Sequence, residues 1–178
     1  MALKSTVFRA ELAVADLDRH YYADHSLTLA RHPAETDLRM MVRLVAFARH
    51  AHPDLRFGRG LCQDEEPDLW RREADGTVRL WVTLGQPDPR RLRKACGRAE
   101  AVVVYTYQPR AARAWWDQHG EELARLARLR VVHLPDAAEA GLADLVQPRM
   151  ALTATLQEDT LWLADGQRTV TLHCQAAR

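Results

Sequence analysis

Apolar and polar residues alternate along two stretches near the start of the chain, residues 5–15 and 20–31. Period-two alternation among β-prone residues is typical of strands that bury one face. The polar segment Asp16–Arg19 separates the two stretches. The pattern therefore predicts an antiparallel pair of strands.

After Pro33 the spacing of apolar residues becomes helical and remains so to about Ala51. The expected buried stripe consists of Leu38, Met41, Val42, Val45 and Ala48. Glu35 falls in the expected first turn, where a carboxylate suits the helix dipole. Because Glu35, Arg39 and Arg43 are four residues apart, they share a face, which is either an exposed salt-bridged surface or a functional face turned toward a cleft.

Residues 53–63 suggest a loop, and residues 64–99 contain the clearest local signals of the chain. The β-prone runs Leu69–Arg72 and Val78–Leu84 flank an Asp75–Gly76 pair, which predicts a hairpin. Asp88 suits a helix N-cap and Pro89 the first helical position, so a helix is expected from there to about residue 99.

Residues 101–107 form a nearly continuous apolar run, which predicts a strand buried on both faces. A helix at about 111–129 and a strand at 131–135 follow, and this order implies a right-handed parallel crossover. A short helix is expected at 138–146. The remainder resembles an antiparallel meander with a turn at Asp165–Gly166. The expected fold class is α/β, with a mixed sheet flanked by helices and extra antiparallel strands.

The length of 178 residues suits one domain, residues 1–178. No export signal or membrane-length apolar run is visible, and Cys62, Cys96 and Cys174 are scattered, so a cytoplasmic monomer or weak oligomer with no membrane contact is expected. The net charge of +1 argues against a strong sequence-independent nucleic-acid binder, so any such contact must be local. The basic residues include only two lysines, Lys4 and Lys94.

Acidic and amide side chains gather around the expected hairpin. Glu66 and Asp68 precede its first strand and Gln86 follows its second. Antiparallel pairing places these positions at the same end of the hairpin. Oxygen ligands are what Mg²⁺ prefers, and the ammonium of Lys94 on the next helix could orient water or offset charge on a phosphate. The pattern indicates a metal-dependent phosphodiesterase site, with structural ion pairs as the plainer alternative.

Four stretches resemble the YaeQ family of bacterial proteins, in the same order and across essentially the whole chain. They are HYYADHSLTLARHPAETDLRMMVRLVAFA, DEEPDLW, LWVTLGQP and RKACGRA. The resemblance implies a variant of the PD-(D/E)xK nuclease fold, with a restriction-endonuclease-like αβββαβ core in a single nuclease-like domain. It also implies a hydrolase that acts on nucleic acid with Mg²⁺, or Mn²⁺ in its place. The alternative is a non-catalytic module that binds nucleic acid or protein on a degenerate nuclease fold.

The resemblance assigns roles to individual residues. Glu35 would be the helix acid, Asp68 or Glu66 the strand acid, and Gln86 the stand-in for the second strand acid. The sequence departs from the family pattern at the lysine, because Asp88 stands two residues after Gln86, so Lys94 would supply the ammonium. The expected catalytic residues are Glu35, Asp68, Gln86 and Lys94, the metal ligands Glu35, Glu66, Asp68 and Gln86, and the substrate contacts His25, Arg39, Arg91, Arg93 and Arg98.

The tripeptide Asp24–His25–Ser26 contains the residue types of a catalytic triad. Neighbouring residues on a strand point to opposite faces of the sheet and cannot form a hydrogen-bonded relay. Serine nucleophilic catalysis is therefore not expected, although His25 could still reach a cleft.

Overall fold

The computed structural model describes residues 4–59 and 65–177, so Cys62 lies outside the described residues. Across them the fold is mixed α/β, with two mixed sheets and three α-helices. The chain divides into two compact units, which are described separately below. Unit 1 is Met1–Ala51 with Asp136–Cys174, and unit 2 is His52–Pro135 with Gln175–Arg178. The expectation of a single domain stays a prediction.

Unit 1 contains a five-stranded sheet with the order β10-β9-β8-β1-β2. Its strands are β1 (Thr6–Asp16), β2 (Tyr21–Arg31), β8 (Arg149–Gln157), β9 (Thr160–Ala164) and β10 (Thr169–His173). The predicted antiparallel pair β1–β2 and the predicted meander β8–β9–β10 are both confirmed. The sequence analysis did not anticipate that β1 also pairs with β8 in parallel, which joins the two sets of strands into one sheet.

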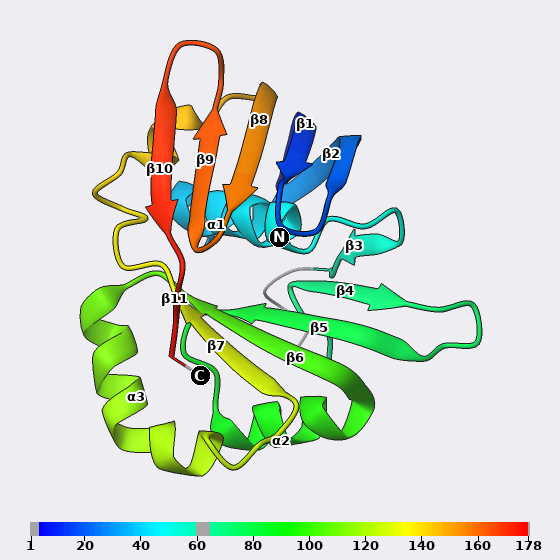
Figure 1. Ribbon diagram of the computed structural model, residues 1–178, viewed down its shortest axis with the longest axis vertical. Helices are drawn as coiled ribbons and strands as arrows, with labels where there is room; N and C mark the ends of the chain where they lie inside the picture. The colour runs from blue at the N-terminus through cyan, green and yellow to red at the C-terminus, as the bar shows by residue number, and fades with distance from the viewer. Residues whose placement is uncertain (1–3, 60–64, 178) are drawn as a thin grey trace. The chain divides into compact units, whose positions relative to one another are not determined.

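Helix α1 (Asp37–Arg49) lies along one face of this sheet (Figure 1). The predicted start at Pro33 is wrong, because the side chain of Thr36 accepts a hydrogen bond from the Arg39 amide and serves as the N-cap. Glu35 therefore precedes the helix. The short helix expected at 138–146 is reduced to one 3₁₀ turn, η1 (Leu142–Leu145).

Unit 2 contains a six-stranded sheet with the order β11-β7-β6-β5-β4-β3. Its strands are β3 (Leu55–Phe57), β4 (Leu69–Arg72), β5 (Val78–Leu84), β6 (Ala99–Thr106), β7 (Leu129–His133) and β11 (Gln175–Ala176). The β4–β5 hairpin is confirmed, and Gly76 adopts the positive φ of 89° that its tight turn requires. Strands β5, β6 and β7 are parallel neighbours. The predicted parallel pairing of β6 with β7 is confirmed, whereas the parallel pairing of β5 with β6 was not anticipated.

Helices α2 (Pro89–Arg98) and α3 (Pro109–Leu123) cover the same face of the unit 2 sheet (Figure 1). Their apolar residues pack with strand residues in one buried cluster that includes Trp81, Leu92, Ala95, Val102, Val104, Trp115, Leu123 and Val131. The predicted start of α2 at Asp88 and Pro89 is confirmed. Helix α3 ends six residues before the predicted end. No helix in the described part of the chain is long and apolar enough to cross a membrane.

The start of α2 provides a test of capping energy. Asp88 accepts a hydrogen bond of 2.7 Å from the Arg90 amide, so we expect Asp88→Ala to lower the free energy of unfolding by about 0.5–2 kcal/mol. Gln108→Ala is the matched control, because Gln108 holds the same position at α3 but makes no side-chain capping hydrogen bond. Urea unfolding followed by circular dichroism measures both, and equal losses for the two variants would contradict the assignment.

Candidate functional site

The residues that the sequence analysis assigned to one site are divided between the two units. His25, Glu35 and Arg39 belong to unit 1, whereas the acids at residues 66 and 68, Gln86 and the cations of α2 belong to unit 2. The convergence of Glu35 with the residues of unit 2 stays a prediction. Each group is described below within its own unit.

Glu35 takes part in a buried ion cluster. Its Oε2 accepts a hydrogen bond of 2.8 Å from Nη2 of Arg43, and its Oε1 accepts bonds from Nε of Arg43 at 2.8 Å and Nη1 of Arg39 at 2.9 Å. The side chains of Glu35 and Arg43 are only 3% and 4% exposed. Arg43 also donates to the Ala30 carbonyl on β2. The shared face is therefore a buried pairing that ties the segment before α1 to the sheet.

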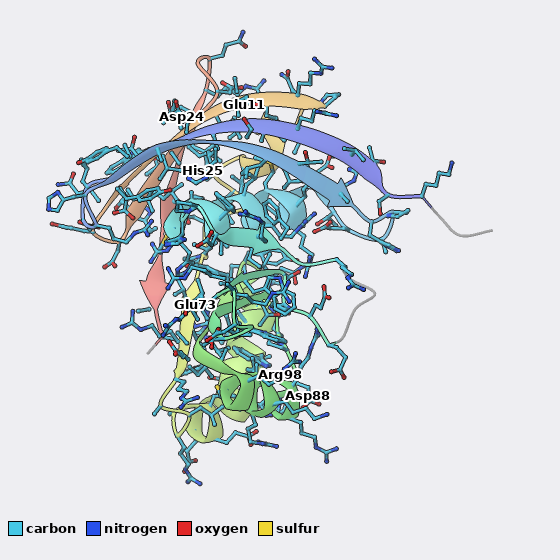
Figure 2. All side chains as sticks on the ribbon, turned by 90° about the vertical axis from the view of Figure 1, so that its right-hand side faces the viewer. Glu11, Asp24, His25, Glu73, Asp88 and Arg98 are labelled. Atoms are coloured by element: carbon cyan, nitrogen blue, oxygen red, sulfur yellow. The ribbon has the colours of Figure 1, made fainter. Side chains whose placement is uncertain are left out.

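His25 points from β2 toward α1, whereas Asp24 and Glu11 lie on the opposite face of the sheet (Figure 2). Its Nε2 lies 2.8 Å from the Tyr21 hydroxyl, and its ring meets the Phe47 ring edge-on at 5.1 Å. Burial lowers the pKa of His25, and the nearby charge of Asp24 opposes this shift. Because its neighbours point to the other face, the triad does not form, as expected.

Asp68 closes the open end of the β4–β5 hairpin. Its Oδ2 accepts a hydrogen bond of 2.8 Å from the Leu84 amide and one of 3.4 Å from the Thr83 hydroxyl. Gln86 follows Leu84 by two residues, so Asp68 and Gln86 lie at the same end of the hairpin, as the antiparallel pairing predicts. The amide nitrogen of Gln86 is buried and has no hydrogen-bond partner among the described residues.

Glu66 is held by Arg59 on the segment before it. Its carboxylate lies 3.2 Å from the Arg59 guanidinium and accepts a hydrogen bond of 3.1 Å from the Arg59 amide. The Glu66 carbonyl accepts a weak bond of 3.5 Å from Arg91. Within the described residues, no three His, Cys, Asp or Glu side chains gather closely enough to hold a metal ion.

A groove of about 690 Å³ runs along α2 in unit 2. It is lined by Glu65, Trp81, Asp88, Arg90, Arg91, Lys94, Ala95, Gly97 and Arg98. The Arg98 guanidinium lies 5.2 Å from the centre of the Trp81 ring and donates to the Glu65 carbonyl at 3.1 Å. Asp88 caps the N-terminus of α2 and Arg98 is its last residue; both are labelled in Figure 2.

The cations of this groove form a row. Arg90, Lys94 and Arg98 are four residues apart on one face of α2, so each step rises about 6 Å along the helix axis. No other described residue forms a hydrogen bond or ion pair with the side chains of Arg90 and Lys94. Arg93 instead pairs with Glu122 on α3 at 3.0 Å. Sequence reasoning missed Arg90, although its spacing of four from Lys94 could have identified it.

The chain matches the YaeQ protein family across residues 1–174. It belongs to the YaeQ family. The resemblance found in four short stretches is thereby confirmed for the whole chain. Among curated relatives, the Escherichia coli K12 protein named "Uncharacterized protein YaeQ" is 44% identical over 176 residues, 99% of this chain and 97% of that protein. The Salmonella typhi protein of the same name is 43% identical with the same coverage.

Two solved YaeQ structures have the same fold as this chain. The crystal structure of the YaeQ protein from Xanthomonas axonopodis pv. citri aligns with a TM-score of 0.94 at 46% identity and covers 98% of both chains. The YaeQ protein from Pseudomonas syringae aligns with a TM-score of 0.92 at 32% identity, covering 98% of this chain and 96% of that one.

The buried pair of this YaeQ chain provides a second stability test. Glu35→Gln leaves the Arg43 charge buried without its counter-ion, so we expect the free energy of unfolding to fall by about 3–5 kcal/mol. The matched control is Glu121→Gln, because Glu121 pairs with Arg125 and both side chains are largely exposed, and a change within about 0.5 kcal/mol is expected there. Urea unfolding measures both. A loss at Glu35 as small as at Glu121 would contradict the buried pairing.

Proposed function

We propose that this protein binds the phosphate backbone of nucleic acid along the α2 groove. The observation that carries the proposal is the row of Arg90, Lys94 and Arg98 on one face of a helix. Cations outnumber acids in the groove, and the carboxylate of Asp88 is already engaged as the helix cap. Phosphate contacts of this kind depend on local charge, so they are compatible with the net charge of +1.

A buried aromatic ring supports one of the charges at the edge of the groove. Trp81 lines it, and Arg98 lies over the Trp81 ring. Guanidinium groups held by a ring or a carbonyl lose less freedom when they bind a phosphate. Arg91 donates a hydrogen bond to the Glu66 carbonyl, and Arg98 donates one to the Glu65 carbonyl. The cations at this edge of the groove are therefore partly preorganised.

The order of elements supports a nuclease-like ancestry for the binding module. From α1 to β6 the chain follows the order α1-β3-β4-β5-α2-β6, which is the αβββαβ order of restriction-endonuclease-like cores. Strands β5 and β6 are parallel neighbours on either side of α2 in the chain. In this proposal the groove lies along α2, which is one of the elements of this αβββαβ order.

The geometry supports binding better than Mg²⁺-dependent hydrolysis. Both carboxylate oxygens of Glu35 accept bonds from arginines, and both oxygens of Glu66 face Arg59. Asp68 already accepts two hydrogen bonds. Mg²⁺ is usually bound through one or two carboxylates together with water and substrate phosphate oxygens. Since Gln86 carries no charge and the acids already have partners, this donor set offers such an ion little free carboxylate. Hydrolysis stays the second candidate because Asp68 and Gln86 share one end of the hairpin.

The salt dependence of binding tests the proposal. We expect a fluorescein-labelled DNA or RNA duplex to bind at low salt, with log K falling linearly with log salt in anisotropy titrations. The triple variant Arg90→Gln, Lys94→Gln, Arg98→Gln should reduce the magnitude of this slope by about 2–3. Arg125→Gln, an exposed arginine paired with Glu121, should leave the slope unchanged.

Two results would overturn the binding proposal: no binding by the wild-type chain at low salt, or an unchanged slope in the triple variant. The same labelled duplex, incubated with Mg²⁺ or Mn²⁺, tests the second candidate. Cleavage that disappears in Asp68→Asn would make hydrolysis the function instead. An intact duplex that still binds would support the non-catalytic module.

A further inference from the structure

A second cavity, of about 480 Å³, lies in unit 2 at the carboxyl ends of β6 and β7. Its wall includes Thr106 and His133 at these strand ends and Trp116 from α3. In open α/β sheets, ligands bind outside the carboxyl ends of parallel strands. The volume falls within the range of small-molecule sites. The cavity shares no lining residue with the α2 groove.

One side of the cavity is an ordered aromatic pair. The rings of Trp116 and His133 meet nearly perpendicular, 6.1 Å apart. The buried Thr106 hydroxyl hydrogen-bonds Nδ1 of His133 and fixes the orientation of the imidazole. Burial lowers the pKa of His133, which favours the neutral imidazole.

Gly120 sets the position of the indole. A Cβ atom at Gly120 would lie only 2.9 Å from Cε2 of Trp116, so the ring rests directly against the backbone of the next helical turn. This close contact supports one side of the indole. A supported aromatic side chain at a cavity wall loses little freedom when a ligand ring packs on it.

None of the described residues pairs with the arginine and aspartate side chains that line this cavity. Arg110 lies in the first turn of α3, and Arg113 and Asp117 follow it at intervals of three and four residues. Although Arg113 and Asp117 have the spacing of a helical ion pair, neither these two nor Arg110 forms a hydrogen bond or ion pair with another described residue. Two guanidiniums and one carboxylate are therefore available to a ligand that carries both an anion and hydrogen-bond donors.

We propose that this cavity binds a nucleoside monophosphate. Its phosphate contacts the guanidiniums of Arg110 and Arg113, its base packs on Trp116 and His133, and its ribose hydroxyls or base amine donate to Asp117. Guanidinium pairs suit phosphate because they donate parallel, charge-assisted hydrogen bonds. The Asp117 carboxylate and the aromatic wall favour this ligand over inorganic phosphate. Inorganic phosphate has no aromatic ring to pack on Trp116 and few hydrogen-bond donors for Asp117. The proposal stands independently of the α2 groove.

Titration of the full chain with AMP tests the proposal. We expect saturable binding by calorimetry and a shift of the Trp116 indole N–H resonance, assigned with Trp116→Phe. Adenosine and inorganic phosphate, which each supply half of the ligand, should bind at least about tenfold more weakly. No saturable AMP binding, or equal affinity for inorganic phosphate, would overturn the proposal.

Variants locate the binding. Arg110→Gln with Arg113→Gln should weaken AMP binding by at least about tenfold, and both positions are exposed, so folding should be retained. Gly120→Ala should weaken AMP binding by displacing the indole, whereas Gly97→Ala, with nothing within 4 Å of its added Cβ, should not. Lys94→Gln, in the α2 groove, is the matched charge control. AMP affinity unchanged in the double arginine variant, or lost in Lys94→Gln, would refute this location.

Discussion

The parallel pairing of β5, β6 and β7 determines where the chemistry of unit 2 lies. Parallel neighbours cannot be joined by a tight turn, so the chain must cross over the sheet through a helix, and such crossovers are right-handed. Two successive crossovers in the same direction place α2 and α3 on one face. Each helix starts at the carboxyl end of a strand, and its apolar stripe faces the sheet. The first turn of α3 therefore lies beside the carboxyl ends of β6 and β7, where the cavity is, whereas the cation row extends along the whole of α2.

Features governed by neighbouring residues could be predicted from the sequence. The Asp75–Gly76 turn, the Asp88 cap with Pro89, and the buried run after Ala99 all depend on residues a few positions apart, and the structure has each of them. The start of α1 shows the limit of this reasoning. Pro33 suits a first helical turn, but the Thr36 side chain caps the helix three residues later. This shift places Glu35 just before the helix, where it pairs with Arg43, and its expected role as the helix acid stays a prediction.

Pairings between distant segments could not be predicted. Alternation identifies a strand but not its neighbour, so the parallel β1–β8 ladder was missed and the strands of unit 1 were expected to flank a single sheet. The spacing of Glu35 and Arg43 gives a shared face but not its burial. The spacing of Arg110, Arg113 and Asp117 is visible in the sequence, yet only the fold brings Thr106 and His133, which are 27 residues apart, to the same strand ends.

The ladder between β1 and β8 also bears on the order in which the chain acquires structure. Residues 52–135 of unit 2 form an uninterrupted stretch of the chain. In contrast, β1 pairs with β8, which is synthesised about 140 residues later. During synthesis from the N-terminus, most of unit 2 can therefore fold while the edge of β1 that pairs with β8 still has no partner strand. An open strand edge attracts foreign strands. The nascent chain is therefore most vulnerable to aggregation before residues 149–157 emerge and close that edge.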